Sequence, residues 1–163
     1  MALVTAIPWY ALAVAALFVD QVTKYATAYY MAYGAQIRIT PFFNLVHVRN
    51  EGAAFSFLAD AGGWQRYLFI AVALGVSAYL AVMLSRGLEK IEAAGYALIL
   101  GGALGNVADR ILRGSVVDFL DFHFRNAHWP AFNLADVAIF LGVVCIIGAT
   151  LVSKDSPARD QTK

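Results

Sequence analysis

Residues Tyr67–Leu84, YLFIAVALGVSAYLAVML, indicate the fold class of this chain of 163 residues. They contain no charged side chain and approach the roughly 20 apolar residues that a helix needs to cross a bilayer. Three further stretches are similar in length and apolar character, so we expect an all-α polytopic membrane protein with a single membrane domain over residues 1–163. The four transmembrane helices are expected at about 7–29, 66–84, 92–112 and 131–152, and two long outer loops at about 30–65 and 113–130.

The composition agrees with this class of protein. Hydrophobic residues make up 61% of the chain and charged residues 14%, a balance that excludes an ordinary soluble domain and a disordered chain. The formal net charge of +1 predicts no nucleic-acid partner. The single cysteine, Cys145, cannot form an internal disulfide, and His47, His123 and His128 lack the spacing of a zinc site. We expect no metal and no other cofactor.

The first apolar stretch has an alternative interpretation as a cleaved secretory signal. Ala11–Val19 resembles the apolar core of such a signal, and Ala26-Thr27-Ala28 resembles a cleavage site. A signal normally carries Lys or Arg before its apolar core, and Met1–Val19 contains neither. We therefore favour a retained membrane span.

The distribution of Lys and Arg predicts the orientation of the spans. The short connector 85–92 and the tail 153–163 hold five basic residues in 19 positions, whereas the connectors 29–66 and 111–130 hold five in 58. Because cytoplasmic loops are enriched in basic residues, we expect both termini in the cytoplasm and both long loops outside.

The two outer loops differ from hydrophilic tethers. Gln36–Val48 alternates and contains β-branched and aromatic residues, which predicts strand-like structure that Ala53–Leu58 would continue. The Gly62-Gly63 pair marks a turn before the second span. The second loop is expected to be a surface loop that rests on the bilayer through a set of aromatic residues: Phe119, Phe122, Phe124, Trp129 and Phe132.

Charged residues inside the spans are expected to meet near the outer face. With a rise of about 1.5 Å per residue, Asp20 lies about 20 Å and Asp109 about 24 Å across a hydrocarbon core of about 30 Å. Asp136 enters from the outer side to a depth of about 8 Å. Asp118 follows the third span by six residues, so a short return of the loop could bring it to the same level. A charge at such a depth is costly and is usually paired or functional.

Several of these polar residues have both structural and functional interpretations. Asp20 and Lys24 are four residues apart on one helix face, so they could form an ion pair that holds the bundle or act directly. Asn106, Asp109 and Arg110 share a face in the same way, and we favour a structural or positioning role. Arg113 is expected to be a surface charge. The small residues of Gly101–Gly105 predict close helix packing.

The remaining candidates for chemistry are two carboxylates. Asp118 and Asp136 lie at the two ends of the second outer loop, each in an apolar and aromatic setting. Two carboxylates placed close together in a poorly solvated site share a proton and titrate as a pair. One can then serve as general base toward water and the other as general acid, which is how two aspartates hydrolyse a peptide bond.

Two other functions fit the same composition. In a small proton- or cation-coupled transporter, Asp20, Asp109 and Asp136 would relay ions. In a non-catalytic assembly factor, the aromatic outer loops would bind the proteins that are assembled.

Five short motifs follow one another along the chain: Asp20-x-x-x-Lys24, Asn50-x-Gly52-Ala53-x-Phe55, Gly105-Asn106-x-x-Asp109-Arg110, Val117-Asp118-Phe119 and Phe132-Asn133-x-Ala135-Asp136. Each motif is weak alone. Together, on a four-span chain of this length, they resemble lipoprotein signal peptidase (signal peptidase II) of bacteria.

The resemblance implies an aspartic endopeptidase that removes the signal peptide from diacylglyceryl-modified prolipoproteins by cutting just before the lipidated cysteine. It implies that Asp118 and Asp136 are the catalytic pair. It further implies residues that line the site and position substrate or carboxylates, and residues that support the geometry. The former are Asn50, Asn106, Arg110 and Asn133, and the latter are Asp20, Lys24, Gly105 and Asp109.

The same resemblance implies an extramembrane β-cradle, which fits Gln36–Leu58, and a location in the bacterial inner membrane with the active site toward the periplasm. It implies contact with membrane lipids, sensitivity to a globomycin-type inhibitor and a monomeric state.

Overall fold

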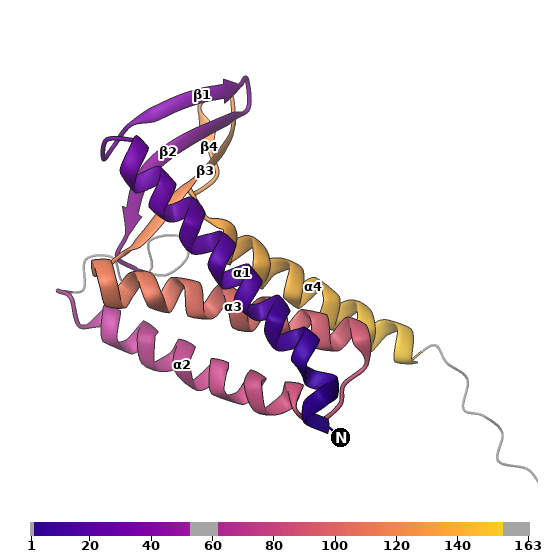
Figure 1. Ribbon diagram of the computed structural model, residues 1–163. Helices are drawn as coiled ribbons and strands as arrows, with labels where there is room; N and C mark the ends of the chain where they lie inside the picture. The colour runs from indigo at the N-terminus through magenta and orange to yellow at the C-terminus, as the bar shows by residue number, and fades with distance from the viewer. Residues whose placement is uncertain (1, 53–61, 155–163) are drawn as a thin grey trace, which may run out of the picture.

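The computed structural model describes residues 2–52 and 62–154. Four helices in this part of the chain are long and apolar enough to cross a membrane. They are α1 (Ala2–Tyr30), α2 (Gln65–Leu84), α3 (Lys90–Arg113) and α4 (Leu134–Lys154) (Figure 1). The predicted four-span membrane fold is confirmed, and α4 begins three residues later than expected.

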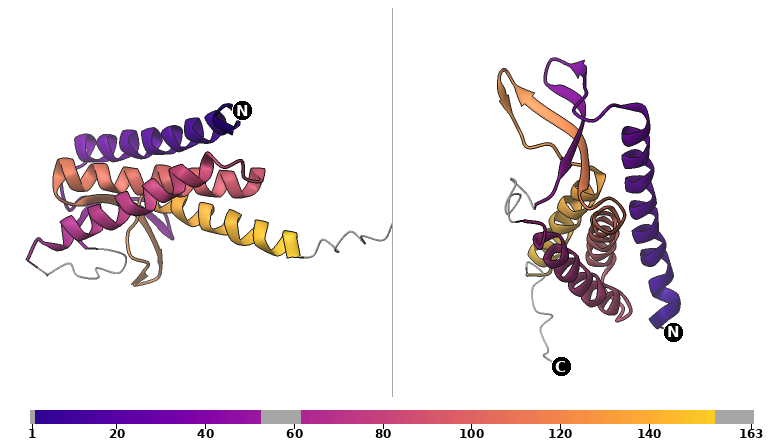
Figure 2. Two further views of the ribbon diagram at one scale, coloured as in Figure 1. Left: turned by 90° about the horizontal axis from the view of Figure 1, so that it is seen from below. Right: turned by 90° about the vertical axis from the view of Figure 1, so that its left-hand side faces the viewer.

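Helix α3 lies in the middle of the bundle, with the other three helices around it (Figure 2). Its small residues allow this central position. A Cβ atom at Gly101 would collide with the carbonyl oxygen of Ala13 on α1, and one at Gly102 with that of Ala135 on α4. Gly101–Gly105 therefore packs closely, as its spacing predicts.

The outer loops form one antiparallel sheet at the end of the bundle away from the start of α1 and the end of α4 (Figure 1). Its strands are β1 (Gln36–Thr40), β2 (Phe43–Asn50), β3 (Val116–Phe124) and β4 (Ala127–His128), in that order. The strand prediction for Gln36–Val48 is confirmed. The expected continuation at Ala53–Leu58 lies outside the described residues, as do the motif positions Ala53 and Phe55.

The second outer loop corrects an expectation. It was expected to be a surface loop, but it forms β3 and β4, and β3 pairs with β2 from the first loop. The physical reason is the left-handed Gly114, with φ of 83°, which ends α3 and turns the chain directly into β3. Phe132 pairs with Leu120, so the extended chain continues almost to the start of α4.

Polar and aromatic contacts hold the sheet together. Asn44 Nδ2 donates to Asp121 Oδ2 at 2.8 Å, and His128 Nδ1 lies 2.9 Å from Asp121 Oδ1. Burial acts to raise the pKa of Asp121, but the hydrogen bonds from Asn44 and His128 outweigh it and hold that pKa below its ordinary value. The Phe43 and Phe122 rings, on facing positions of β2 and β3, lie 4.8 Å apart.

The contribution of the close approach of α3 and α4 to stability can be tested at Gly102. Gly102→Ala should lower the free energy of unfolding by about 1–3 kcal/mol, because its methyl group forces the two backbones apart. The measurement is thermal unfolding of the purified protein in detergent. Gly75→Ala is the matched control, since a Cβ there meets nothing within 4 Å and α2 should be no less stable. Equal midpoints for the two variants would contradict the packing argument.

Candidate active site

The connection between α3 and β3 sets the position of Asp118. The backbone N–H of Val117 donates to Asp109 Oδ2 at 2.9 Å, which fixes the start of β3 against the end of α3. Asp118 is then 3% exposed, and its Oδ1 accepts a hydrogen bond of 2.6 Å from Asn133 Nδ2. Burial and the nearby carboxylate of Asp136 raise the pKa of Asp118 to about 7.

Asp136 is placed by the N-terminal cap of α4. The Asn133 side chain accepts a hydrogen bond of 3.0 Å from the Asp136 N–H, and Asp136 Oδ2 accepts one of 3.2 Å from the Asn133 N–H. This reciprocal pair is a capping box, in which an acidic residue stands at the third helical position. The other oxygen, Oδ1, accepts from Asn106 Nδ2 at 2.9 Å.

Asn133 connects the two carboxylates. Its side-chain oxygen caps the helix that carries Asp136, and its side-chain nitrogen binds Asp118. The amide is completely buried, so its orientation is set by these partners. Residues 18 positions apart are thereby brought into one polar site near the junction of the sheet and the bundle.

A buried ionic cluster lies beside this site. Lys24 Nζ is 2.9 Å from Asp20 Oδ2 and 3.5 Å from Asp109 Oδ2, and all three side chains are fully buried. Lys24 also donates to Asn106 Oδ1 at 2.8 Å. The ion pair considered for Asp20 and Lys24 is therefore present. Because Asn106 in turn binds Asp136, the cluster is connected to the carboxylate site through one amide.

Asp20 also holds α1 against α3 and α4. Its Oδ1 accepts a hydrogen bond of 2.8 Å from the Ala135 N–H, in the first turn of α4. A Cβ atom at position 105 would lie 2.5 Å from Asp20 Oδ2, so only glycine leaves room for this carboxylate. Gly105 is thus required by the position of a charge in the neighbouring helix.

The expectation that Arg113 is a surface charge is wrong. Its Nη1 forms an ion pair with Asp109 Oδ1, one helical turn earlier, and its side chain is only 21% exposed. The reason is that Asp109 sits between α1 and the start of β3, so its second oxygen faces the last turn of α3.

Arg110 and Asn50 face the same site. Arg110 Nη2 donates to the Gly52 carbonyl at 2.8 Å, and its guanidinium lies 5.2 Å from the centre of the Phe69 ring. Its charge interacts with the carboxylates of Asp136 and Asp118. Asn50, at the end of β2, forms a side-chain hydrogen bond to Asp118.

One residue of the network was missed in the sequence. Gln21 Nε2 lies 3.1 Å from Asp20 Oδ2, 3.1 Å from the Gly105 carbonyl and 3.3 Å from Asp109 Oδ1. Its position three residues before Lys24, on a shared helix face, is the signal that could have identified it.

The arrangement suits acid–base chemistry. Within residues 2–52 and 62–154, no three His, Cys, Asp or Glu side chains form a group that could hold a metal ion. A buried carboxyl group that keeps its proton near neutral pH, next to a second carboxylate, can donate one proton while its partner accepts another.

The family model of signal peptidase (SPase) II matches residues 12–152. The lipoprotein signal peptidase of Serratia marcescens is 52% identical over 135 residues, which cover 83% of this chain and 79% of the relative. That of Paraburkholderia phymatum is 52% identical over 141 residues, which cover 86% of this chain and 85% of the relative.

Two solved structures of bacterial membrane enzymes, both obtained by the in meso method, are similar in fold. One has a TM-score of 0.84 at 31% identity and covers 96% of this chain and 94% of its own. The other has a TM-score of 0.78 at 33% identity and covers 91% and 94%. The family match covers most of α1, nearly all of α4 and everything between them. The resemblance seen in the motifs is confirmed: this four-span membrane chain belongs to the signal peptidase II family.

Proposed function

We propose that the chain is a membrane aspartic endopeptidase that removes the signal peptide from diacylglyceryl-modified prolipoproteins, cutting just before the lipidated cysteine. Asp118 and Asp136 are its catalytic pair. The observation that carries this assignment is the single buried amide of Asn133, which binds Asp118 and caps the helix that presents Asp136. Family membership supplies the reaction class.

The two carboxylates take different roles. Asp118 is the more deeply buried and its pKa is raised to about 7, so the proton shared by the pair resides on it. Asp136 accepts two N–H donors, which stabilise a negative charge. Asp136 therefore takes a proton from water as the oxygen attacks the scissile carbonyl carbon, and Asp118 donates its proton to the carbonyl oxygen. When the tetrahedral gem-diol intermediate collapses, the C–N bond breaks and the proton held by Asp136 passes to the leaving nitrogen. One hydroxyl of the intermediate returns its proton to Asp118 as the new carboxyl group forms, which restores the starting state of the pair.

The neighbouring polar residues position this chemistry. Asn50, Asn106 and Asn133 hold the carboxylates through their side-chain amides. Arg110 has a buried Nε with no acceptor among the described residues, and this N–H is available to a substrate carbonyl. Asp20, Lys24, Gly105 and Asp109 support the geometry from behind the site.

The position of the site suits a substrate that stays in the membrane. The carboxylates lie at the end of the bundle that carries the sheet, where a lipid-modified cysteine would present its peptide bond. We assign this end to the outer, periplasmic face of the bacterial inner membrane and both termini to the cytoplasm, on the Lys and Arg distribution. From membership of the family we also expect contact with membrane lipids, sensitivity to a globomycin-type inhibitor and a monomeric state.

The transporter interpretation gains no support. Asp20 and Asp109 are neutralised by Lys24 and Arg113 inside one compact cluster, rather than spaced along a path across the membrane. Ion relay requires carboxylates that can gain and lose charge in turn. The family matched by the chain is a family of peptidases.

Asp118→Asn and Asp136→Asn should each reduce cleavage of a diacylated prolipopeptide by at least about a hundredfold, because each removes one partner of proton transfer. The measurement is the rate of product formation by purified protein in detergent. Asp121→Asn, on the same strand but in the sheet network, is the matched control and should cleave at nearly the wild-type rate. Full cleavage by either of the first two variants would overturn the mechanism.

The raised pKa of Asp118 predicts a pH dependence. Cleavage should fall as the pH rises through about 7, because Asp118 then loses the proton that it must donate. It should also fall at acid pH, where both carboxylates are protonated. Single-turnover rates between pH 5 and 9 test this. A flat profile with cleavage itself rate-limiting would contradict it, whereas Asp121→Asn should keep the wild-type profile.

The same pKa has a consequence for stability. The folded state disfavours charged Asp118, so the protein should lose stability as the pH rises from the ordinary aspartate pKa of about 4 toward 7. Asp118→Asn removes this effect, and its thermal midpoint relative to wild type should therefore rise between pH 5 and pH 8.

Lys24→Met should lower the free energy of unfolding by about 3–5 kcal/mol, because Asp20 and Asp109 would share a buried site without their central cation. Thermal unfolding in detergent measures this loss. Lys90→Met, at the exposed start of α3, is the control and should have little effect. The loss of stability should be the main effect of Lys24→Met, and the folded variant should lose comparatively little of its cleavage rate. A large loss of cleavage rate with little loss of stability would make Lys24 a direct participant in catalysis.

A further inference from the structure

A second polar pocket lies where α2 begins and α3 ends, two segments that run side by side (Figure 1). It has a volume of about 640 Å³. Three arginines from three different elements line it: Arg49 at the end of β2, Arg66 in the first turn of α2 and Arg113 in the last turn of α3. None of the three belongs to the proposed catalytic machinery.

The charge in this pocket is unbalanced. Arg113 is paired with Asp109, and Glu51 is the single carboxylate among the lining residues. Arg49 and Arg66 form no ion pair with any residue in the described part of the chain, 2–52 and 62–154. The pocket therefore carries excess positive charge and favours an anionic ligand.

In the described part of the chain, the guanidinium of Arg66 lacks one hydrogen-bond acceptor. Its Nε is buried and has no hydrogen-bond acceptor among the described residues, which is costly for a charged group. One face of its guanidinium is covered, since it lies 5.3 Å from the centre of the Tyr67 ring. The planar edge of an arginine binds two oxygens of a phosphate at once, so a phosphate would satisfy Nε together with a terminal nitrogen.

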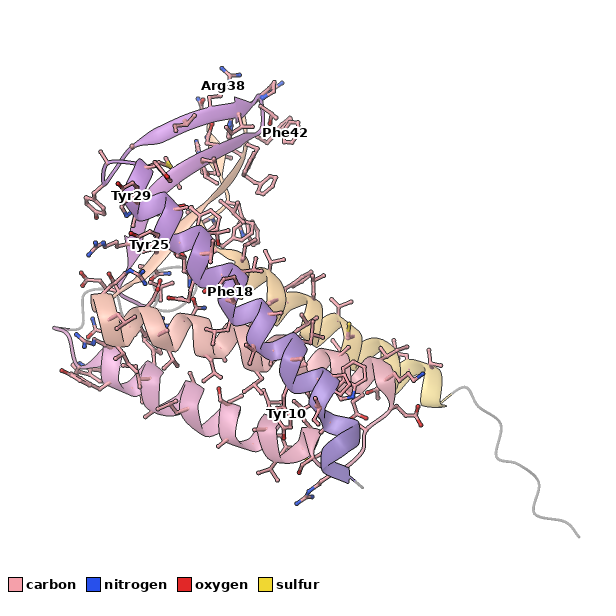
Figure 3. All side chains as sticks on the ribbon, in the orientation of Figure 1. Tyr10, Phe18, Tyr25, Tyr29, Arg38 and Phe42 are labelled. Atoms are coloured by element: carbon pink, nitrogen blue, oxygen red, sulfur yellow. The ribbon has the colours of Figure 1, made fainter. Side chains whose placement is uncertain are left out.

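The depth of the pocket in the membrane indicates the source of such a phosphate. Trp64 and Tyr67, at the same end of α2, are 54% and 67% exposed. Tyr25 and Tyr29 stand on the part of α1 nearest the sheet, with ring centroids 6.0 Å apart (Figure 3). Exposed Trp and Tyr near the ends of membrane helices mark the interface, which is the level of the lipid headgroups.

We propose that this pocket binds the phosphate group of an anionic phospholipid, with Arg66 and Arg49 as its charged ligands. The dipole of α2 adds a partial positive charge at the start of this helix. The site lies at the same end of the bundle as the carboxylate pair, so an anionic lipid held there would fix the depth of the enzyme at the interface. This binding does not depend on the proposed peptidase activity.

The test is lipid titration of the full-length protein in a zwitterionic detergent, followed by thermal unfolding. Short-chain phosphatidylglycerol should raise the midpoint at concentrations where phosphatidylcholine of the same chain length has no effect. Arg66→Gln and Arg49→Gln should each weaken the apparent affinity for phosphatidylglycerol about tenfold, since each removes a charge-assisted hydrogen bond. Arg38→Gln, a matched charge removal on β1 at the far edge of the sheet, should leave it unchanged (Figure 3).

Three results would overturn the proposal. Equal responses to phosphatidylglycerol and phosphatidylcholine would show that the pocket does not select an anion. An equal loss in Arg38→Gln would show that only overall charge matters. Stabilisation by inorganic phosphate or glycerol phosphate, with none by phosphatidylglycerol, would identify a soluble ligand instead of a lipid. If Arg66→Gln failed to fold, Arg49→Gln would still decide the outcome, because Arg49 is exposed and unpaired among the described residues.

Discussion

The ammonium group of Lys24 compensates two carboxylates inside the membrane-spanning bundle, and three helices are connected through it. Asp20 is on α1 with Lys24, Asp109 is on α3, and Asp20 also accepts the N–H of Ala135 on α4. In hydrocarbon an unpaired charge would be far costlier than in water, so the cluster constrains how these helices can pack. Gly105 shows the constraint directly, because its missing side chain makes room for the Asp20 carboxylate.

Side-chain amides connect this cluster to the carboxylate pair through hydrogen bonds. Asn106 accepts from Lys24 and donates to Asp136, and Asn133 caps α4 while it holds Asp118. An amide can do this because it has a donor end and an acceptor end, whereas a carboxylate or an ammonium has one kind only. The proposed catalytic residues are thus positioned by groups that do not compete with them for the shared proton.

The sheet, the carboxylate pair and the arginine pocket all lie at one end of the bundle. The substrate proposed here is anchored by acyl chains and would reach the enzyme by diffusion in the membrane plane, so a fixed depth would matter more than a soluble docking surface. The exposed aromatic residues at this end suit the membrane interface, and the proposed phosphate site in the arginine pocket would hold the enzyme at that level.

Local composition and spacing were enough to predict the four spans, the close packing at Gly101–Gly105 and the strand character of Gln36–Val48. It also placed Asp20, Asp109 and Asp136 at similar depths, since helix rise converts position into distance. The folded structure was needed to show that both outer loops form one sheet, that Asp109 is shared by Lys24 and Arg113, and that Asn133 joins the two aspartates. These contacts link segments distant in sequence, and their partners are selected by strand register and by the burial of charge, which no local pattern encodes.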